Sequence, residues 1–168
     1  MTKRNLKKML KPETIKILIV DDNKKNLLTL HTLINEYIDD VQVIEAKSGM
    51  AALGVIMKEK VDLIILDIQM PEMDGFETAK TIHSWKKTAH VPIVFLTAAY
   101  KAEEFQQQGF AVGAADYLTK PIDAPQLISR IKSYLRFIEQ EHRHHCDLEH
   151  QIQTRTAELQ DRTAELLE

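Results

Sequence analysis

The sequence contains a single cysteine, no long apolar run and no excess of basic charge. The one cysteine, Cys146, cannot form a disulfide within the chain, so a disulfide scaffold is excluded and a reducing compartment is expected. No run approaches the ~20 apolar residues that a membrane-spanning helix needs. The net charge of −3 gives no support for nucleic-acid binding. We therefore expect a cytoplasmic protein that contacts neither membrane nor nucleic acid directly.

The 168 residues indicate one domain with an extension, and a hydrophobic content of 44% is enough for one core. Residues 1–14 are basic, with five Lys or Arg among the first eleven residues. No long apolar segment follows them, so they do not form a secretory signal. We interpret residues 1–14 as a basic tail rather than as a nucleic-acid-binding arm.

Five short apolar runs recur along the chain, and each is predicted to be a strand. They start at Ile15, Val41, Val61, Val91 and Ala115. The first, third and fourth are nearly continuous in Ile, Leu and Val, which is typical of strands buried on both faces of a parallel sheet. Segments with helical period lie between the strands, and this alternation predicts βαβ units with right-handed crossovers. The expected fold class is therefore α/β, with a doubly wound sheet and helices on both faces.

The helical segments between the strands each show an apolar face. One stripe consists of Leu27, Leu30, Leu33, Ile34 and Tyr37, and a second consists of Phe76, Ala79, Ile82 and Trp85. Ser48 and Asp74 stand where N-caps are wanted, and Asp123 is suited to cap a last helix.

The last helix is predicted to be unusually long, because no Gly and no further Pro occur between Pro125 and Glu168. Its polar part, residues 139–168, contains the tandem heptads RTAELQD and RTAELLE. One position recurs every seven residues, at Ile138, His145, Ile152, Leu159 and Leu166. This is the period of a left-handed coiled coil. We predict a marginal two-helix coil that makes the protein a homodimer, against the alternative of a solitary exposed helix.

Polar side chains stand where the predicted strands end. Asp21 and Asp22 follow the first strand, and Asp67, Thr97 and Lys120 end or follow the third, fourth and fifth. Ligands of a doubly wound sheet bind outside the carboxyl ends of its strands, so these side chains are expected to converge on one crevice. Three clustered carboxylates repel one another and need a cation, and hard oxygen ligands suit Mg²⁺. A carboxylate beside Mg²⁺ and an ammonium group can attack phosphorus and form an acyl phosphate.

This set of signals resembles the receiver domain of two-component response regulators. The matching residues are DD after the first strand, ILDIQMPEMDG at the third, T at the fourth and KP after the fifth. The resemblance covers about residues 15–138 and implies a flavodoxin-like five-stranded parallel sheet. It implies a phosphorylation-dependent switch whose partner is a sensor histidine kinase or a phosphotransfer protein. It implies no enzyme activity beyond the domain's own phosphorylation and dephosphorylation.

The resemblance also assigns roles to the acidic residues. Asp67 is implied to be the phosphoacceptor. Asp22 and Asp67 are implied to ligate Mg²⁺ directly, together with the main-chain carbonyl of Gln69. Asp21 is implied to help to hold the ion.

The remaining site residues are implied to act on the phosphoryl group. Lys120 is implied to pair with Asp67 and then with its phosphoryl group, and the Lys120–Pro121 bond is expected to be cis. Thr97 and Tyr117 are implied to form a switch pair, in which Thr97 moves towards the phosphoryl group and Tyr117 turns inward behind it.

The output of such a switch is not defined by these residues. Helices with RTAEL-type heptads resemble the signalling helices that join receivers to cyclic-dinucleotide cyclases, phosphodiesterases or histidine kinases. We expect residues 139–168 to form such a helix and to lead to an output domain that is absent from this chain.

Other functions fit the sequence less well. A haloacid-dehalogenase-like phosphatase wants a second Asp where this chain has Gln69. A phosphotransfer histidine at His145 lacks the sequence motif of a kinase phosphoacceptor helix. A metal site at His142, Cys146 and His150, which share one helix face, lacks a converging second element. The main alternative is a degenerate receiver that binds partners without phosphorylation, although no key acidic residue, threonine or lysine is lost.

Overall fold

The computed structural model describes residues 14–98, 113 and 115–165. The basic segment before Thr14 and the last heptad residue, Leu166, lie outside these ranges. The chain divides into two compact units, Met1–Lys132 and Ser133–Glu168. Among the described residues, no helix combines the length and the apolar character needed to cross a membrane.

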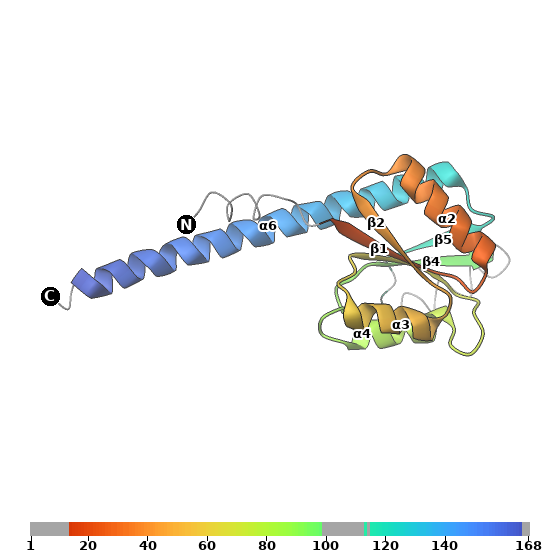
Figure 1. The fold of residues 1–168 in the computed structure, drawn as a ribbon, viewed down its shortest axis with the longest axis horizontal. Coiled ribbons are helices and arrows are strands. Elements are labelled where there is room, and N and C mark those ends of the chain that lie inside the picture. Colours follow the sequence, from red (N-terminus) through yellow and green to blue (C-terminus); the bar gives the residue numbers. More distant parts are fainter. Residues whose placement is uncertain (1–13, 99–112, 114, 166–168) are drawn as a thin grey trace. The chain divides into compact units, whose positions relative to one another are not determined.

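The first unit contains one five-stranded sheet in the order β2-β1-β3-β4-β5, with every neighbouring pair parallel (Figure 1). The strands are β1 (Ile15–Val20), β2 (Val41–Ala46), β3 (Leu63–Asp67), β4 (Ile93–Ala98) and β5 (Asp116–Lys120). The three central strands are buried along almost their whole length, because both faces of the sheet are covered. The predicted doubly wound, flavodoxin-like fold is confirmed.

The register places the ends of the strands beside one another. Asp67, the last residue of β3, pairs with Leu96, and Thr97 pairs with Thr119 on β5. Since all the strands run in the same direction, the residues that follow them gather at one edge of the sheet.

In the described part of the chain, the helices are α2 (Lys24–Tyr37), α3 (Gly49–Lys58), α4 (Gly75–Ser84) and α6 (Ala124–Glu165). A side chain caps each of α2, α3 and α4. Ser48 and Asp74 cap α3 and α4 as predicted, and the Asp123 carboxylate accepts a hydrogen bond from the Gln126 backbone N–H at the start of α6. Asn23 caps α2, so Asp21 and Asp22 do not serve as its N-cap.

The core lies on both faces of the sheet, with α3 and α4 on one face and α2 on the other (Figure 1). On the first face, Phe95 of β4 packs in a cluster with Leu53 of α3 and Ile82 of α4. On the α2 side, the buried helix residues are Leu27, Leu30 and Ile34.

The prediction that Tyr37 belongs to the buried stripe of α2 is wrong. Tyr37 is 52% exposed, whereas its neighbour Ile38 is 7% exposed. The helix ends at Tyr37 and the chain becomes extended at Ile38, so the side-chain direction changes there and Ile38 takes the buried place.

Candidate functional site

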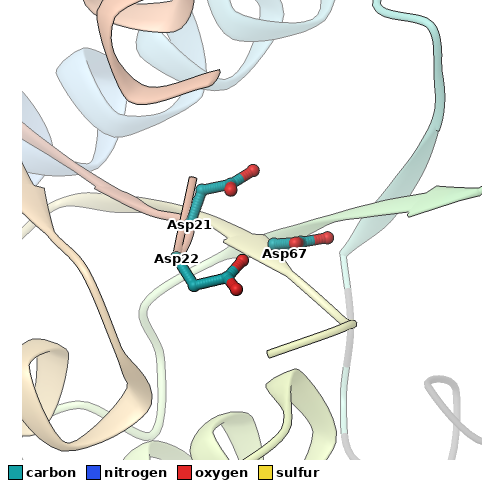
Figure 2. Close-up of side chains that lie close together, drawn as sticks. All are labelled: Asp21, Asp22 and Asp67. Atoms are coloured by element: carbon teal, nitrogen blue, oxygen red, sulfur yellow. The ribbon is translucent and has the colours of Figure 1, made fainter. Parts of the chain in front are cut away.

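Three carboxylates converge at the carboxyl edge of the sheet, as the sequence predicts. Asp21 and Asp22 follow β1 and lie beside Asp67 at the end of β3, with carboxylate oxygens within 4.8 Å of one another (Figure 2). Asp21 and Asp67 are buried, with exposed fractions of 0% and 4%, whereas Asp22 is exposed. The cluster therefore has a buried side and a side open to solvent.

Lys120 joins two of these carboxylates. Its ammonium nitrogen lies 3.0 Å from Asp21 Oδ2 and 3.0 Å from Asp67 Oδ1. The resemblance implied the pairing with Asp67, and the structure adds Asp21, which lies 99 positions away in the sequence. The Lys120–Pro121 bond is cis, as expected.

The electrostatics of the cluster are set by burial and by this lysine. Burial raises the pKa of Asp67 above its ordinary value, the nearby Asp21 adds to the rise, and Lys120 opposes it. Burial alone would lower the pKa of Lys120, but its hydrogen bonds and charge interactions with Asp21 and Asp67 outweigh burial and raise it. Lys120 is therefore charged at neutral pH.

The donor set fits a hard divalent cation. Three carboxylates face a single ammonium group here, so the acidic groups outnumber the cation beside them. The donors are all oxygens, and the exposed Asp22 leaves one side open to water, which suits the incomplete protein coordination that Mg²⁺ prefers.

Asn26 is a member of the site that the sequence reading missed. Its amide nitrogen lies 3.1 Å and 3.0 Å from the two oxygens of Asp21. The Asn23 backbone N–H also donates to Asp21, at 2.8 Å. One signal in the sequence could have indicated this contact: Asn26 lies in the first turn of a helix that begins just after Asp21 and Asp22. Side chains of a helix tilt towards its N-terminus, so a residue of the first turn can reach back to the end of the preceding strand.

The predicted switch residues lie on adjacent strands. Thr97 is fully buried, and its hydroxyl donates a long bond of 3.3 Å to the carbonyl of Ala98. Tyr117 is partly buried against Phe95, with ring centroids 5.5 Å apart. Burial raises the pKa of Tyr117 to about 12. Phe95 and Thr97 share a face of β4, and Tyr117 lies opposite Phe95, so the two switch residues are on the same side of the sheet.

The loop after Asp67 is held close to the strand end. The Gln69 backbone N–H donates to the Asp67 carboxylate, and the Gln69 side chain is exposed. The Gly75 backbone N–H donates to the Ile68 carbonyl at 2.9 Å, which ties the start of α4 to the residue after Asp67.

Comparison with known proteins identifies the family. A family model for the response regulator receiver domain matches residues 17–132. The chain belongs to the receiver family. Membership of this family supports a role in phosphorylation-dependent signalling, and the cluster of Asp21, Asp22 and Asp67 could hold a metal ion.

The receiver is similar to proteins of different overall length. It is 38% identical over 120 residues to a "Probable cyclic di-GMP phosphodiesterase" of Vibrio cholerae, and the match covers 71% of this chain but only 26% of that relative. It is 36% identical over 124 residues to the polar-differentiation response regulator DivK of Brucella ovis, covering 73% of this chain and 97% of DivK. The solved structure of the Vibrio cholerae chemotaxis protein CheY4 matches with a TM-score of 0.66 and 30% identity, covering 72% and 98% of the two chains.

The histidine and cysteine cluster of α6 does not form a comparable site. Within the described ranges, the acidic cluster is the one group of three or more potential ligand residues whose atoms lie within 4.8 Å of one another. His142, Cys146 and His150 are not such a group.

Proposed function

We propose that the chain is a phosphorylation switch in which Asp67 accepts a phosphoryl group from a histidine kinase or a phosphotransfer protein. The observation that carries the proposal is the placement of Asp67. The residue is 4% exposed and ends a central strand. Its carboxylate lies 3.0 Å from the Lys120 ammonium and beside two further carboxylates. A purely structural ion pair would not need the two additional acidic groups.

Asp22, Asp67 and the Gln69 carbonyl would hold Mg²⁺, with Asp21 behind them, and the ion would supply positive charge against the phosphoryl oxygens. An oxygen of Asp67 attacks phosphorus, the bond from phosphorus to the donor's imidazole nitrogen breaks, and the imidazole leaves with the electron pair. The Lys120 ammonium then binds an oxygen of the new acyl phosphate.

Thr97 and Tyr117 are proposed to carry the change away from the site. Among the described residues, the Thr97 hydroxyl donates a long bond of 3.3 Å to the Ala98 carbonyl, so little is lost when it turns to donate to a phosphoryl oxygen. The space around Thr97 would then favour a further inward position of Tyr117, which already packs against Phe95. Phosphorylation would in this way bias two arrangements of the surface at β4 and β5.

The proposal is tested by intact-mass measurement after incubation with Mg²⁺ and acetyl phosphate. We expect wild type to gain one phosphoryl group and Asp67→Asn to gain none, because an amide oxygen cannot form the acyl phosphate. Asp62→Asn is the matched control, since Asp62 is another buried aspartate and the amide oxygen can still accept the 2.9 Å bond from the Lys16 backbone N–H. It should be phosphorylated like wild type. No adduct on the wild-type protein would favour a binding module that works without phosphorylation.

We further propose that the unit Ser133–Glu168 pairs with a second copy of the chain and relays the state of the receiver. The helix α6 is 42 residues long, and Leu148, Ile152 and Leu159 are 44%, 64% and 63% exposed. These three side chains recur at intervals of four and seven residues, which places them on one stripe. A polar helix of this length gains little stability from its own sequence, and pairing with a second helix would bury the apolar stripe.

The phosphodiesterase relative from Vibrio cholerae supports a proposal for the output domain. Its printed name is that of a cyclic di-GMP phosphodiesterase, and this chain matches only 26% of it. We propose that the helix transmits phosphorylation to an output domain of the cyclic-dinucleotide or histidine-kinase class. The change would take the form of altered pairing or register of the two helices.

Pairing through α6 predicts which substitutions weaken association. Removing residues 155–168, or replacing Ile152 with Asp, should shift the protein towards monomer in sedimentation over a concentration series. Burial of an isoleucine side chain contributes about 1.5–3 kcal/mol, so the dissociation constant should rise tenfold or more. Ala157→Asp, on another face of the same helix, should leave association unchanged. Equal behaviour of Ile152→Asp and Ala157→Asp would contradict the coiled coil.

A further inference from the structure

Asn26 stands out because it contacts the acidic cluster and carries no charge. It lies in the first turn of α2, and its amide nitrogen is within hydrogen-bond distance of both oxygens of the fully buried Asp21, at 3.1 Å and 3.0 Å. The amide must present its nitrogen rather than its oxygen to Asp21, because a carbonyl oxygen facing two carboxylate oxygens would be repelled.

The hydrogen bonds of Asp21 show how its oxygens are used. Oδ1 accepts from the Asn23 backbone N–H at 2.8 Å and from Asn26, and Oδ2 accepts from Lys120 at 3.0 Å and from Asn26. An ionised carboxylate offers about four acceptor positions. Asp21 therefore meets a protein donor at each of them, and it holds the lysine rather than standing open to solvent as Asp22 does.

We propose that Asn26 is a positioning residue for phosphoryl transfer, which acts through Asp21 on Lys120. One N–H of its amide, shared between the two oxygens at 3.1 Å and 3.0 Å, fixes the orientation of the Asp21 carboxylate. The fixed carboxylate then holds the ammonium of Lys120 at the point from which it also reaches Asp67. The inference rests on the proposed role of Asp67, and it adds a residue that no part of the receiver motif in this sequence includes.

The neutral charge of Asn26 is part of this role. An aspartate at this position would bring a fourth carboxylate to about 3 Å from Asp21, and the like charges would force a shared proton. A leucine has nearly the shape of asparagine but donates no hydrogen bond. It would leave Asp21 with one donor at each oxygen, the Asn23 N–H at Oδ1 and Lys120 at Oδ2, so the carboxylate would hold the Lys120 ammonium less firmly.

The test compares Asn26→Leu and Asn26→Ala with wild type, and Asn35→Leu, an exposed site in the last turn of the same helix, is the matched control. The maximal rate of phosphoryl uptake from acetyl phosphate should fall about tenfold or more in both Asn26 variants, the usual effect of removing a group that orients the ligands of a metal site. The Mg²⁺ concentration that half-saturates the rise in melting temperature should stay close to wild type, because Asp22 and Asp67 are unchanged. Asn35→Leu should match wild type in both measurements.

A second readout does not depend on phosphorylation. The ¹H–¹⁵N signal of the Lys120 ammonium, assigned by its loss in Lys120→Met, should be visible in wild type and in Asn35→Leu and should broaden in both Asn26 variants. If wild type takes up no phosphoryl group, the proposed function fails, and this signal alone decides the role of Asn26. Wild-type uptake rates in both Asn26 variants, or an unchanged ammonium signal, would overturn the inference. A large change in the Mg²⁺ midpoint at a normal maximal rate would also overturn it.

Discussion

Replacing Gly75 with alanine is expected to destabilise the receiver by about 1–3 kcal/mol, the usual range for forcing an extra group into a packed site. A Cβ atom at Gly75 would lie 2.5 Å from the backbone oxygen of Asp67 and 2.8 Å from the Ile68 Cα. Both contacts are with backbone, so no side chain can turn away to relieve them. The start of α4 or the end of β3 has to move.

The same movement is expected to damage the site. The Gly75 N–H donates to the Ile68 carbonyl at 2.9 Å, so the start of α4 and the residue after Asp67 move together. We expect slower phosphoryl uptake by Gly75→Ala, measured by intact mass over time, and a lower midpoint in chemical denaturation.

Gly54→Ala provides the matched control for Gly75→Ala. Gly54 lies within α3, and a Cβ atom there meets nothing within 4 Å. Alanine in a helix interior is more favourable than glycine by about 0.5–1 kcal/mol, so this variant should be as stable as wild type or slightly more so. It should be phosphorylated at the wild-type rate. A Gly75→Ala protein as stable and as reactive as Gly54→Ala would contradict the tight packing of α4 against the strand end.

The parts of this receiver that sequence predicts well are those in which local pattern and topology agree. The apolar runs predict the central strands because both faces of β1, β3 and β4 are covered. Once the strands are parallel, their carboxyl ends must share an edge, and the convergence of Asp21, Asp22 and Asp67 follows without knowledge of any distance.

The features of the site and fold that the sequence did not predict depend on the direction of individual side chains. Asn26 could not be recognised, because polar residues at the start of a helix are common and only the three-dimensional turn of α2 aims this one at Asp21. The double contact of Lys120 with Asp21 and Asp67 has the same origin, since it depends on a lysine rotamer. The wrong placement of Tyr37 reflects the end of a helix, where the 3.6-residue period stops being a guide.

Replacing Lys120 with methionine is expected to slow phosphoryl uptake by about 10²–10³, the usual effect of removing one preorganised donor to a developing charge. Methionine has a similar length but supplies no charge. The variant leaves Asp21, Asp22 and Asp67 facing one another with no lysine between them. Lys120→Arg, which keeps the charge but changes the geometry, should retain more activity than Lys120→Met.

Stability should respond to pH and Mg²⁺ in the same variant. Burial already holds the pKa of Asp67 above its ordinary value, so this carboxylate opposes folding at neutral pH and the penalty is relieved as pH falls towards its pKa. Removing Lys120 takes away the main group that lowers the pKa of Asp67, and the penalty at neutral pH should grow. Denaturation should therefore show Lys120→Met less stable than wild type at pH 7 in EDTA. The deficit should shrink at pH 5 and on adding Mg²⁺.

The control for this experiment is Lys16→Met. Lys16 also pairs with a carboxylate, Glu59, at 2.8 Å, but both side chains are partly exposed and the pair lies away from the acidic cluster. Exposed pairs of this kind contribute about 0–1 kcal/mol, so its loss should change stability little and in a way independent of Mg²⁺. If Lys120→Met and Lys16→Met respond alike to Mg²⁺ and pH, the charge balance proposed for the site is wrong. A larger gain from Mg²⁺ in Lys120→Met alone would mean that the lysine and the cation neutralise the same carboxylates.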